Sequence, residues 1–349
     1  MRAPYLTPEG CEGSITSHHP EGMMTRPSIP RRVLFALPAA ALGDPAEATP
    51  TLDRTAQIIV GAAPGGGTDT VARLLAEPLS GRYAPQVIVE NRPGASSRLG
   101  AEALKVAAAD GTAILICPMP VLALCPHVLP RTTRYHPVTD FTAAATVGEL
   151  AYGLIVRRDH PATDLSSFID WARAKGDVTF APPVAGAPQH MLGLALMREA
   201  GLNVTVVTYR ASTLALPDLI AGRLDCYMSH MAELAPQVRG GQARLLAVSS
   251  EARLPGFSDT ATFAQQGFPG ITASEAFAVM LPASTPPNIA AALNAAIAEA
   301  VAEPAMRERL AQLQMTPLVL SPAETAARLA REFTAWGPAV RASGFTPEE

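Results

Sequence analysis

The segment 57–117 alternates short apolar runs with helical patterns, and this order constrains the fold more than any other feature of the chain. Its short runs, rich in β-branched residues, predict strands at 58–60, 87–89 and 113–117. Apolar residues at helical spacing predict helices between them, the second over 98–107. Because strand, helix, strand, helix and strand follow within about sixty residues, we expect right-handed crossovers and a parallel sheet.

The turn after the first predicted strand is rich in glycine. Thr68-Asp69 offers an N-cap for the helix that follows. Glycines leave main-chain N–H groups open to a ligand, and the positive end of the helix dipole adds to them. The turn lacks the lysine of a P-loop and the spacing of a dinucleotide fingerprint. It therefore favours an anion site suited to a singly charged carboxylate, and a turn that only connects strand to helix is the alternative.

Charge and composition exclude several classes of function. The net charge of −4 gives no electrostatic case for binding nucleic acid or an anionic membrane surface. A hydrophobic fraction of 48% with 17% charged residues is typical of a globular protein. At 349 residues, the chain is long enough for two domains.

Residues 1–50 have the pattern of a leader. We expect the true start at Met23 or Met24 and a signal peptide over 24–48. Arg31-Arg32 precedes an apolar core at 33–42, and Ala46-Glu47-Ala48 offers a cleavage site. Export by a Sec or twin-arginine signal therefore places the mature protein in the periplasm, and a disordered tail is the alternative.

The cysteines favour no metal or disulfide framework. Removal of the leader with Cys11 leaves Cys117, Cys125 and Cys226, an odd number. We expect buried, unpaired thiols, with a bridge between Cys117 and Cys125 as the alternative. Neither Cys226 nor His230 has partners at metal-ligand spacing, so we expect no metal and no cofactor.

The rest of the chain repeats the pattern of strand, loop and helix. Predicted strands lie at 149–157, 178–180, 204–208, 224–228, 244–249 and 277–281. Predicted helices lie at 166–174, from 190 onward, at 214–221, at 287–314 with an interruption at Pro304, and at 322–340. In the last helix, a packing stripe is expected from Ala326, Leu329, Phe333 and Trp336. The segment 118–123 should form a second loop on the ligand face, and inward packing of its apolar side chains is the alternative.

Several ordered motifs resemble the Bug family, the periplasmic solute receptors associated with tripartite tricarboxylate transporters. The first three are PGGGTDTVARLLAEPLS, VIVENRPGASSRLGAEAL and AAADGTAILI. Later landmarks follow in the family's order: YHPVTDF at 135–141, QH at 189–190, VTYR at 207–210, DLIAGRLD at 218–225, LLAVS at 245–249 and LPASTP at 281–286. The resemblance spans about residues 57–347.

The resemblance implies the type II periplasmic-binding-protein fold, with two α/β lobes, a ligand cleft between them and two crossover segments. It assigns 51–155 and 274–349 to lobe 1 and 156–273 to lobe 2, with hinges near 152–156 and 273–279. The implied function is a monomeric receptor that closes on a small organic acid and delivers it to a tripartite tricarboxylate-type transporter or sensor. The alternatives are an enzyme acting on a small carboxylate or phosphate ester, and the effector domain of a transcription regulator.

The resemblance and the strand ends together give the expected ligand contacts. Lobe 1 is expected to contribute Pro64, Gly65, Gly66, Gly67, Thr68, Asp69, Met119 and Pro120. Lobe 2 is expected to contribute Gly186, Ala187, Gln189, His190, Tyr209, Arg210, Ser212 and Asp225. Family members generally carry Ser or Thr where this chain has Ala187. That departure, together with the apolar segment 118–123, suggests an aromatic or branched monocarboxylate as the ligand.

Overall fold

The computed structural model describes residues 51–209 and 212–346. The predicted leader, with Cys11, lies outside these residues. Within them, no single helix is both long and apolar enough to cross a membrane. The bent pair formed by α9 (Pro287–Ala302) and α10 (Pro304–Gln312) meets that criterion only when the two helices are taken together.

The first sheet is built from the segment that the sequence singled out. Its parallel strands lie in the order β2, β1, β3. The bounds are β1 (Ala56–Val60), β2 (Val87–Asn91) and β3 (Ala113–Pro118), with α1 (Gly67–Leu79) and α2 (Arg98–Lys105) between them. The predicted alternation of strands and helices is therefore confirmed, and the second helix ends two residues earlier than expected.

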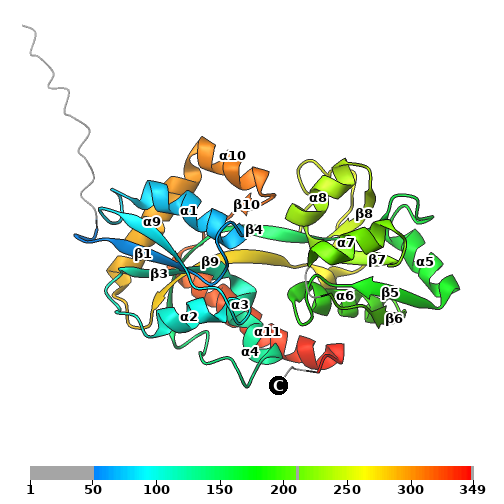
Figure 1. Cartoon of the computed structure of the whole chain (residues 1–349), viewed down its shortest axis with the longest axis horizontal. Helices are drawn as coiled ribbons and strands as arrows, with labels where there is room; N and C mark the ends of the chain where they lie inside the picture. Colours follow the sequence, from blue (N-terminus) through cyan, green and yellow to red (C-terminus); the bar gives the residue numbers. More distant parts are fainter. Residues whose placement is uncertain (1–50, 210–211, 347–349) are drawn as a thin grey trace, which may run out of the picture. The chain divides into compact units, whose positions relative to one another are not determined.

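The strand β4 (Phe141–Arg157) connects the two lobes (Figure 1). It pairs antiparallel with β9 (Ser274–Pro282) in the first sheet, and with β7 (Cys226–His230) and β8 (Ala243–Val248) in the second. The sequence predicted only its second half, because half of the residues in 141–148 are Ala or Gly, which carry a weak strand signal. Two irregularities in its register with β9 occur within that first half.

The second sheet continues with two parallel strands, of which the first pairs with β7 and the second pairs with the first. These are β5 (Asp177–Ala181) and β6 (Asn203–Val206). The helices of this lobe are α5 (Leu165–Lys175), α6 (Pro188–Glu199), α7 (Ser212–Ile220) and α8 (Met231–Arg239). Two α/β lobes joined by crossing strands agree with the predicted fold class, and the residue boundaries between the lobes stay predictions.

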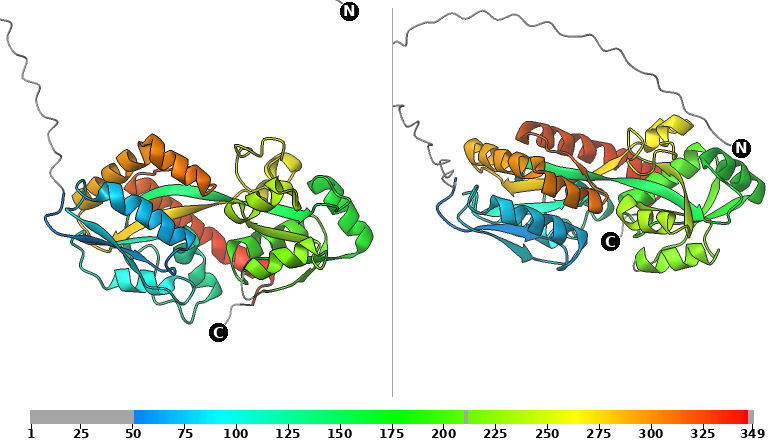
Figure 2. Two further views of the ribbon diagram at one scale, coloured as in Figure 1. Left: turned by 45° about the horizontal axis from the view of Figure 1, so that its top comes forward. Right: turned by 90° about the horizontal axis from the view of Figure 1, so that it is seen from above.

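The C-terminal helix α11 (Pro322–Ser343) contacts elements of both lobes (Figure 2). It packs on β4, on the short helices α3 (Met119–Ala123) and α4 (Cys125–Val128), and on α6. A capping box between Ser321 and Glu324 fixes its start. Ala326 is exposed and does not join the predicted stripe, because Thr325 takes the inward position beside Leu329.

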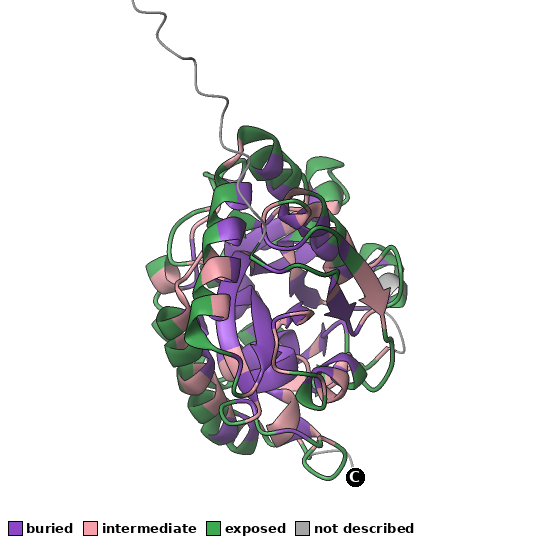
Figure 3. Cartoon of the chain, turned by 90° about the vertical axis from the view of Figure 1, so that its left-hand side faces the viewer, coloured by how far each residue is buried: buried purple, intermediate pink, exposed green. Residues whose placement is uncertain are grey.

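Buried residues concentrate in the strands and on the inward sides of the helices (Figure 3). The prediction of a second ligand loop at 118–123 is wrong, because Met119–Ala123 form the helix α3. Met119 and Leu122 are fully buried in a cluster with Tyr135 and Phe141. Inward packing, the alternative reading, is the one that the structure confirms. Cys117, Cys125 and Cys226 are unpaired thiols, as expected.

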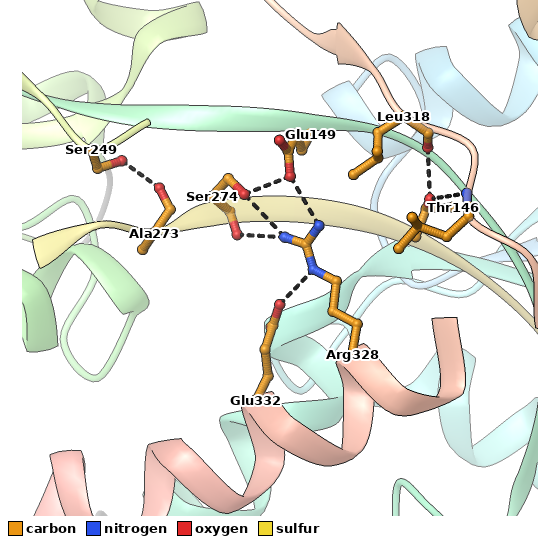
Figure 4. A network of polar contacts seen from close by, with 9 residues as sticks. Thr146, Glu149, Ser249, Ala273, Ser274, Leu318, Arg328 and Glu332 are labelled. Carbon is orange, nitrogen blue, oxygen red and sulfur yellow. Dashed lines mark hydrogen bonds and ion pairs between the residues drawn. The ribbon is translucent and has the colours of Figure 1, made fainter. Parts of the chain in front are cut away.

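A polar network around Arg328 fastens α11 to the crossing strands (Figure 4). The guanidinium donates to the carboxylates of Glu149 on β4 and Glu332 on α11, each at 2.9 Å, and to Ser274 on β9 at 3.0 Å. Burial raises the pKa of Glu332, and the neighbouring guanidinium acts in the opposite direction. One half-buried cation therefore neutralises carboxylates from two elements that lie far apart in sequence.

The turn between β2 and α2 holds three consecutive residues in the left-handed region. Ala95, Ser96 and Ser97 have φ values of 48°, 54° and 67°. Residues other than glycine are disfavoured there, because their Cβ atom lies too close to the following carbonyl oxygen. Arg98 holds the turn by donating from Nε to the carbonyl oxygen of Ala95 at 2.8 Å. The turn is therefore strained and is maintained by its neighbours.

Replacing Arg328 with alanine should lower the free energy of unfolding by about 3 kcal/mol, because it leaves two partly buried carboxylates without their cation. The folded-state pKa of Glu332 already lies above its ordinary value, and losing the guanidinium raises it further. A raised carboxyl pKa stabilises the fold at low pH, and this contribution is lost as the pH rises through the folded-state pKa. The loss in free energy of unfolding caused by Arg328→Ala should therefore be smaller at about pH 5 than at about pH 8.

Denaturant unfolding of the full chain, followed by tryptophan fluorescence, measures this deficit. Arg331→Ala is the matched control, because Arg331 is exposed on the same helix. Equal losses for the two variants, or a deficit that grows at low pH, would contradict the role given to the network.

Replacing Ser97 with glycine should raise the free energy of unfolding by about 1 kcal/mol, because glycine adopts a positive φ without steric cost. Ser166→Gly on α5, where the serine is exposed in a regular helix, should instead lower it by about 0.5 kcal/mol. The same unfolding measurement compares the two variants. A loss of stability in Ser97→Gly would show that the turn is not strained.

Candidate ligand-binding site

A cavity of about 520 Å³ lies between segments that follow strands of both sheets. The first lobe contributes Ser96, from the turn after β2, together with Val128 and Leu129. The second contributes residues 184–186 after β5 and residues 208–209 after β6. Ligands of parallel α/β sheets bind beyond the carboxyl ends of the strands. The position of the cavity follows that rule, and its volume suits a small molecule.

The glycine turn after β1 does not line this cavity. It faces a separate, open hollow of about 500 Å³, which is shared with residues of α1 and with Arg309. Pro64, Gly65 and Asp69 lie there, whereas Gly186 and Tyr209 lie in the interlobe cavity. The structure therefore does not bring the two predicted halves of the site together in one cavity.

Two of the expected N–H donors in the glycine turn already have partners. Gly65 donates its N–H to the Asp69 carboxylate at 2.8 Å, and Gly66 donates to the carbonyl oxygen of Ala63 at 3.2 Å. The predicted N-cap at Thr68-Asp69 is wrong, because α1 begins at Gly67 with Gly66 as its N-cap. Among the described residues, the N–H groups of Gly67, Thr68 and Asp69 have no partner. These three donors are what remains of the predicted anion site.

Asp69 braces the glycine turn from inside. Its carboxylate is 1% exposed and also accepts hydrogen bonds from Arg73 at 2.9 Å and from Asn91 at 2.8 Å. The hydrogen bond from Arg73 is the main cause that lowers its pKa to about 2. A fixed negative charge in the first turn of α1 also favours the helix dipole. Asp69 therefore supports the turn, which is a different role from the expected contact with the ligand.

Met119 and Pro120 are buried in α3, and the expected apolar wall is not built from them. The side chain of Met119 belongs to the hydrophobic cluster around Tyr135 and Phe141. In this part of the chain, the apolar lining of the interlobe cavity instead comes from Val128 and Leu129, a few residues further along.

The loop before α6 brings Gly186 to the cavity. Gly186 has a φ of +75° and donates its N–H to Nδ1 of His190 at 3.1 Å. The helix starts at Pro188 with Ala187 as its N-cap, two residues earlier than predicted, because proline is well suited to the first helical position. Burial lowers the pKa of His190, so the ring is neutral and its Nδ1 accepts the bond. The sequence left open whether this histidine binds the ligand or supports the structure, and its contacts support the structural role.

Gln189 reaches the crossing strands. It is 2% exposed, and its Nε2 lies 3.1 Å from the ring of His230. His230 in turn contacts the Glu275 carboxylate at 3.1 Å, which also accepts from the hydroxyl of Tyr152. Burial opposes protonation of His230, but the carboxylate of Glu275 raises its pKa overall. Gln189 therefore connects the cavity loop to residues on β4, β7 and β9.

Two of the remaining candidates in the second lobe already have partners. Tyr209 lines the cavity with its ring, while its hydroxyl donates to Asp218 at 2.6 Å. Asp225 precedes β7 at the amino end of the strand, where it accepts from the N–H and hydroxyl of Thr179 and pairs with Lys175. Those contacts support the alternative reading of Asp225 as a structural acid. Arg210 lies outside the described residues, as does the side chain of Ser212 at the start of α7.

Sequence reasoning missed most of the cavity's walls. Ser96, Thr208 and Phe345 were not predicted, because no local pattern shows which turns and chain ends meet after folding. Arg98, which does not line the cavity but supports the turn that carries Ser96, was also missed. It is 6% exposed and donates to Thr132 and Thr133 as well as to the Ala95 carbonyl. A cation in the first turn of a helix opposes the dipole, and this unfavourable placement was the available signal.

Comparison with known proteins places the chain in a family. The model for the tripartite tricarboxylate transporter family receptor matches residues 71–345. BugT of Bordetella pertussis is 32% identical over 311 residues, which cover 87% of this chain and 94% of that protein.

Solved structures agree with this match. A Rhodopseudomonas palustris protein solved with adipate is 28% identical, with a TM-score of 0.73, and covers 84% of this chain and 99% of its own. MatC from the same organism, solved with bound malate, is 28% identical with a TM-score of 0.68, over 82% of this chain and 99% of its own. The two-lobe fold expected from the resemblance is thus confirmed. The chain belongs to the family of tripartite tricarboxylate transporter receptors.

Proposed function

We propose that the chain is a periplasmic receptor that captures a small organic carboxylate between its two lobes. The observation that carries the proposal is the interlobe cavity, which segments of both sheets line beyond their strand ends. Two relatives with the same fold were solved with malate and adipate, which are small carboxylates. The cavity supports a small ligand, and the ligands of these relatives support a carboxylate.

The energetics favour binding by closure over binding at one anchor. An anion at a helix N-terminus gains about 0.3–2 kcal/mol, whereas micromolar affinity needs about 8 kcal/mol. The three free N–H groups of the first turn of α1 are therefore insufficient by themselves. Enclosure of the ligand by both lobes supplies the remainder of the binding free energy, because it removes apolar surface of the ligand and the protein from water. Movement of α1 towards the interlobe cavity during closure would add these donors to the site.

We further propose that the closed receptor delivers its ligand to the membrane subunits of a tripartite tricarboxylate transporter. Closure around a ligand creates a surface that the open form lacks, and a membrane partner distinguishes the two forms by that surface. The family match supports this partner.

An enzymatic role finds little support in the site. Burial raises the pKa of the Cys125 thiol to about 11 and raises the pKa values of Cys117 and Cys226 further, so all three are poor nucleophiles. The imidazole of His190 is neutral and accepts a main-chain N–H. The described residues include no His, Cys, Asp and Glu cluster suited to a metal ion.

Calorimetric titration of the purified full chain tests the proposal. At least one of malate, adipate, citrate, benzoate and 3-methylbutanoate should bind with micromolar or tighter affinity, and should raise the melting temperature. Glucose and putrescine serve as a neutral and a cationic control. The bound acid should be recovered chemically unchanged by NMR. Absence of binding by every acid, or conversion of an acid to a product, would refute a receptor role.

A further inference from the structure

Phe345 occupies a position that its place at the end of the chain does not suggest. The helix α11 ends at Ser343, and its C-cap Gly344 has a φ of +73°, which turns the chain back. The N–H of Phe345 then donates to the hydroxyl of Ser343 at 3.1 Å. This turn directs the phenyl ring to the interlobe cavity, where Phe345 is one of the lining residues.

The ring of Phe345 touches segments of both lobes. It packs with Val128 and Met191 in one hydrophobic cluster, and it stands edge-on to the ring of His190 with centroids 5.5 Å apart. A Cβ added at Gly186 would lie only 3.1 Å from the ring. The phenyl group therefore rests against the glycine backbone of the cavity loop, where no larger residue would fit without displacement.

The end of α11 is anchored to the second lobe. Arg198 on α6 donates to the carbonyl oxygen of Ala342 at 2.7 Å, and Val340 is 4% exposed in the same cluster as Phe345. Because these contacts hold the last turn of α11 against the second lobe, the ring that follows it is a fixed wall. A loose chain end would not present a defined surface to a ligand.

The cavity has polar lining from Ser96 and Thr208, and it has hydrocarbon walls besides Phe345. They come from Val128, Leu129, Val184 and Ala185, and Val184 is 52% exposed. Burying such surface against an apolar ligand is favourable, at roughly 25 cal/mol for each Å². A second carboxylate placed against these walls would lose its hydration without gaining hydrogen bonds.

We propose that Phe345 is a specificity-determining residue, which makes the site select monocarboxylates with an aromatic or branched hydrocarbon body over compact dicarboxylates and tricarboxylates. This inference rests on the proposed function. It assigns to the chain a ligand class that differs from the malate and adipate of the solved relatives.

Titration of the full chain with benzoate, 3-methylbutanoate, malate and citrate tests the proposal. The unmodified protein should bind benzoate or 3-methylbutanoate about tenfold more tightly than malate. Phe345→Ala should lower the affinity for benzoate about tenfold and change that for malate by no more than about twofold. Phe268→Ala is the matched control, because Phe268 is another half-buried phenylalanine that does not line the cavity. It should change neither affinity.

The outcomes separate the inference from the function on which it rests. Tighter binding of malate or citrate by the unmodified protein would overturn the role of Phe345 and leave the carboxylate receptor intact. Equal weakening of both ligand classes by Phe345→Ala would overturn it as well. If no acid binds, the proposed function itself falls. Should Phe345→Ala fail to fold, Phe345→Leu keeps apolar bulk without the planar ring, and it should weaken benzoate more than 3-methylbutanoate.

Discussion

The antiparallel pairing of β4 with β9 is the interaction on which the two-lobe arrangement depends. Both strands are buried over most of their length, and their main-chain hydrogen bonds join sequence positions that are more than a hundred residues apart. Side chains on this pair face both lobes: Glu149 and Ser274 bind Arg328, while Tyr152 and Glu275 meet His230. Any relative movement of the lobes must therefore be accommodated by these two strands, by the polar groups on them and by α11, which contacts both lobes.

Much of the fold followed from local sequence patterns. The strands with β-branched runs and the helices with caps, such as α5 with its capping box at Asp164, were found close to their true bounds. Patterns failed where small residues hide a strand, as in the first half of β4, and where an apolar run is a short buried helix, as in α3. In both places tertiary packing decides the structure, and local propensity carries little information.

The candidate site was harder to predict than the fold. The sequence identified turns at strand ends, and Gly186 and Tyr209 do line the interlobe cavity. It did not show that Asp69 fills the glycine turn with its own carboxylate, nor that Phe345 returns to the cavity from the end of the last helix. A local motif does not show that a side chain of the same turn accepts a hydrogen bond from a main-chain N–H, nor that a side chain from a distant segment lines the same cavity. Such features emerge only when the chain path is known.

The place of α11 in the chain has a consequence for biogenesis. Arg328 is synthesised 179 residues after Glu149, the carboxylate that it neutralises. A nascent chain that has not yet reached this helix leaves the carboxylate of Glu149 without its cation, and its two lobes lack the helix that packs on both. The packing of this helix on both lobes therefore forms only after residues 322–343 have been made. Prematurely terminated products would remain incompletely assembled and open to proteases.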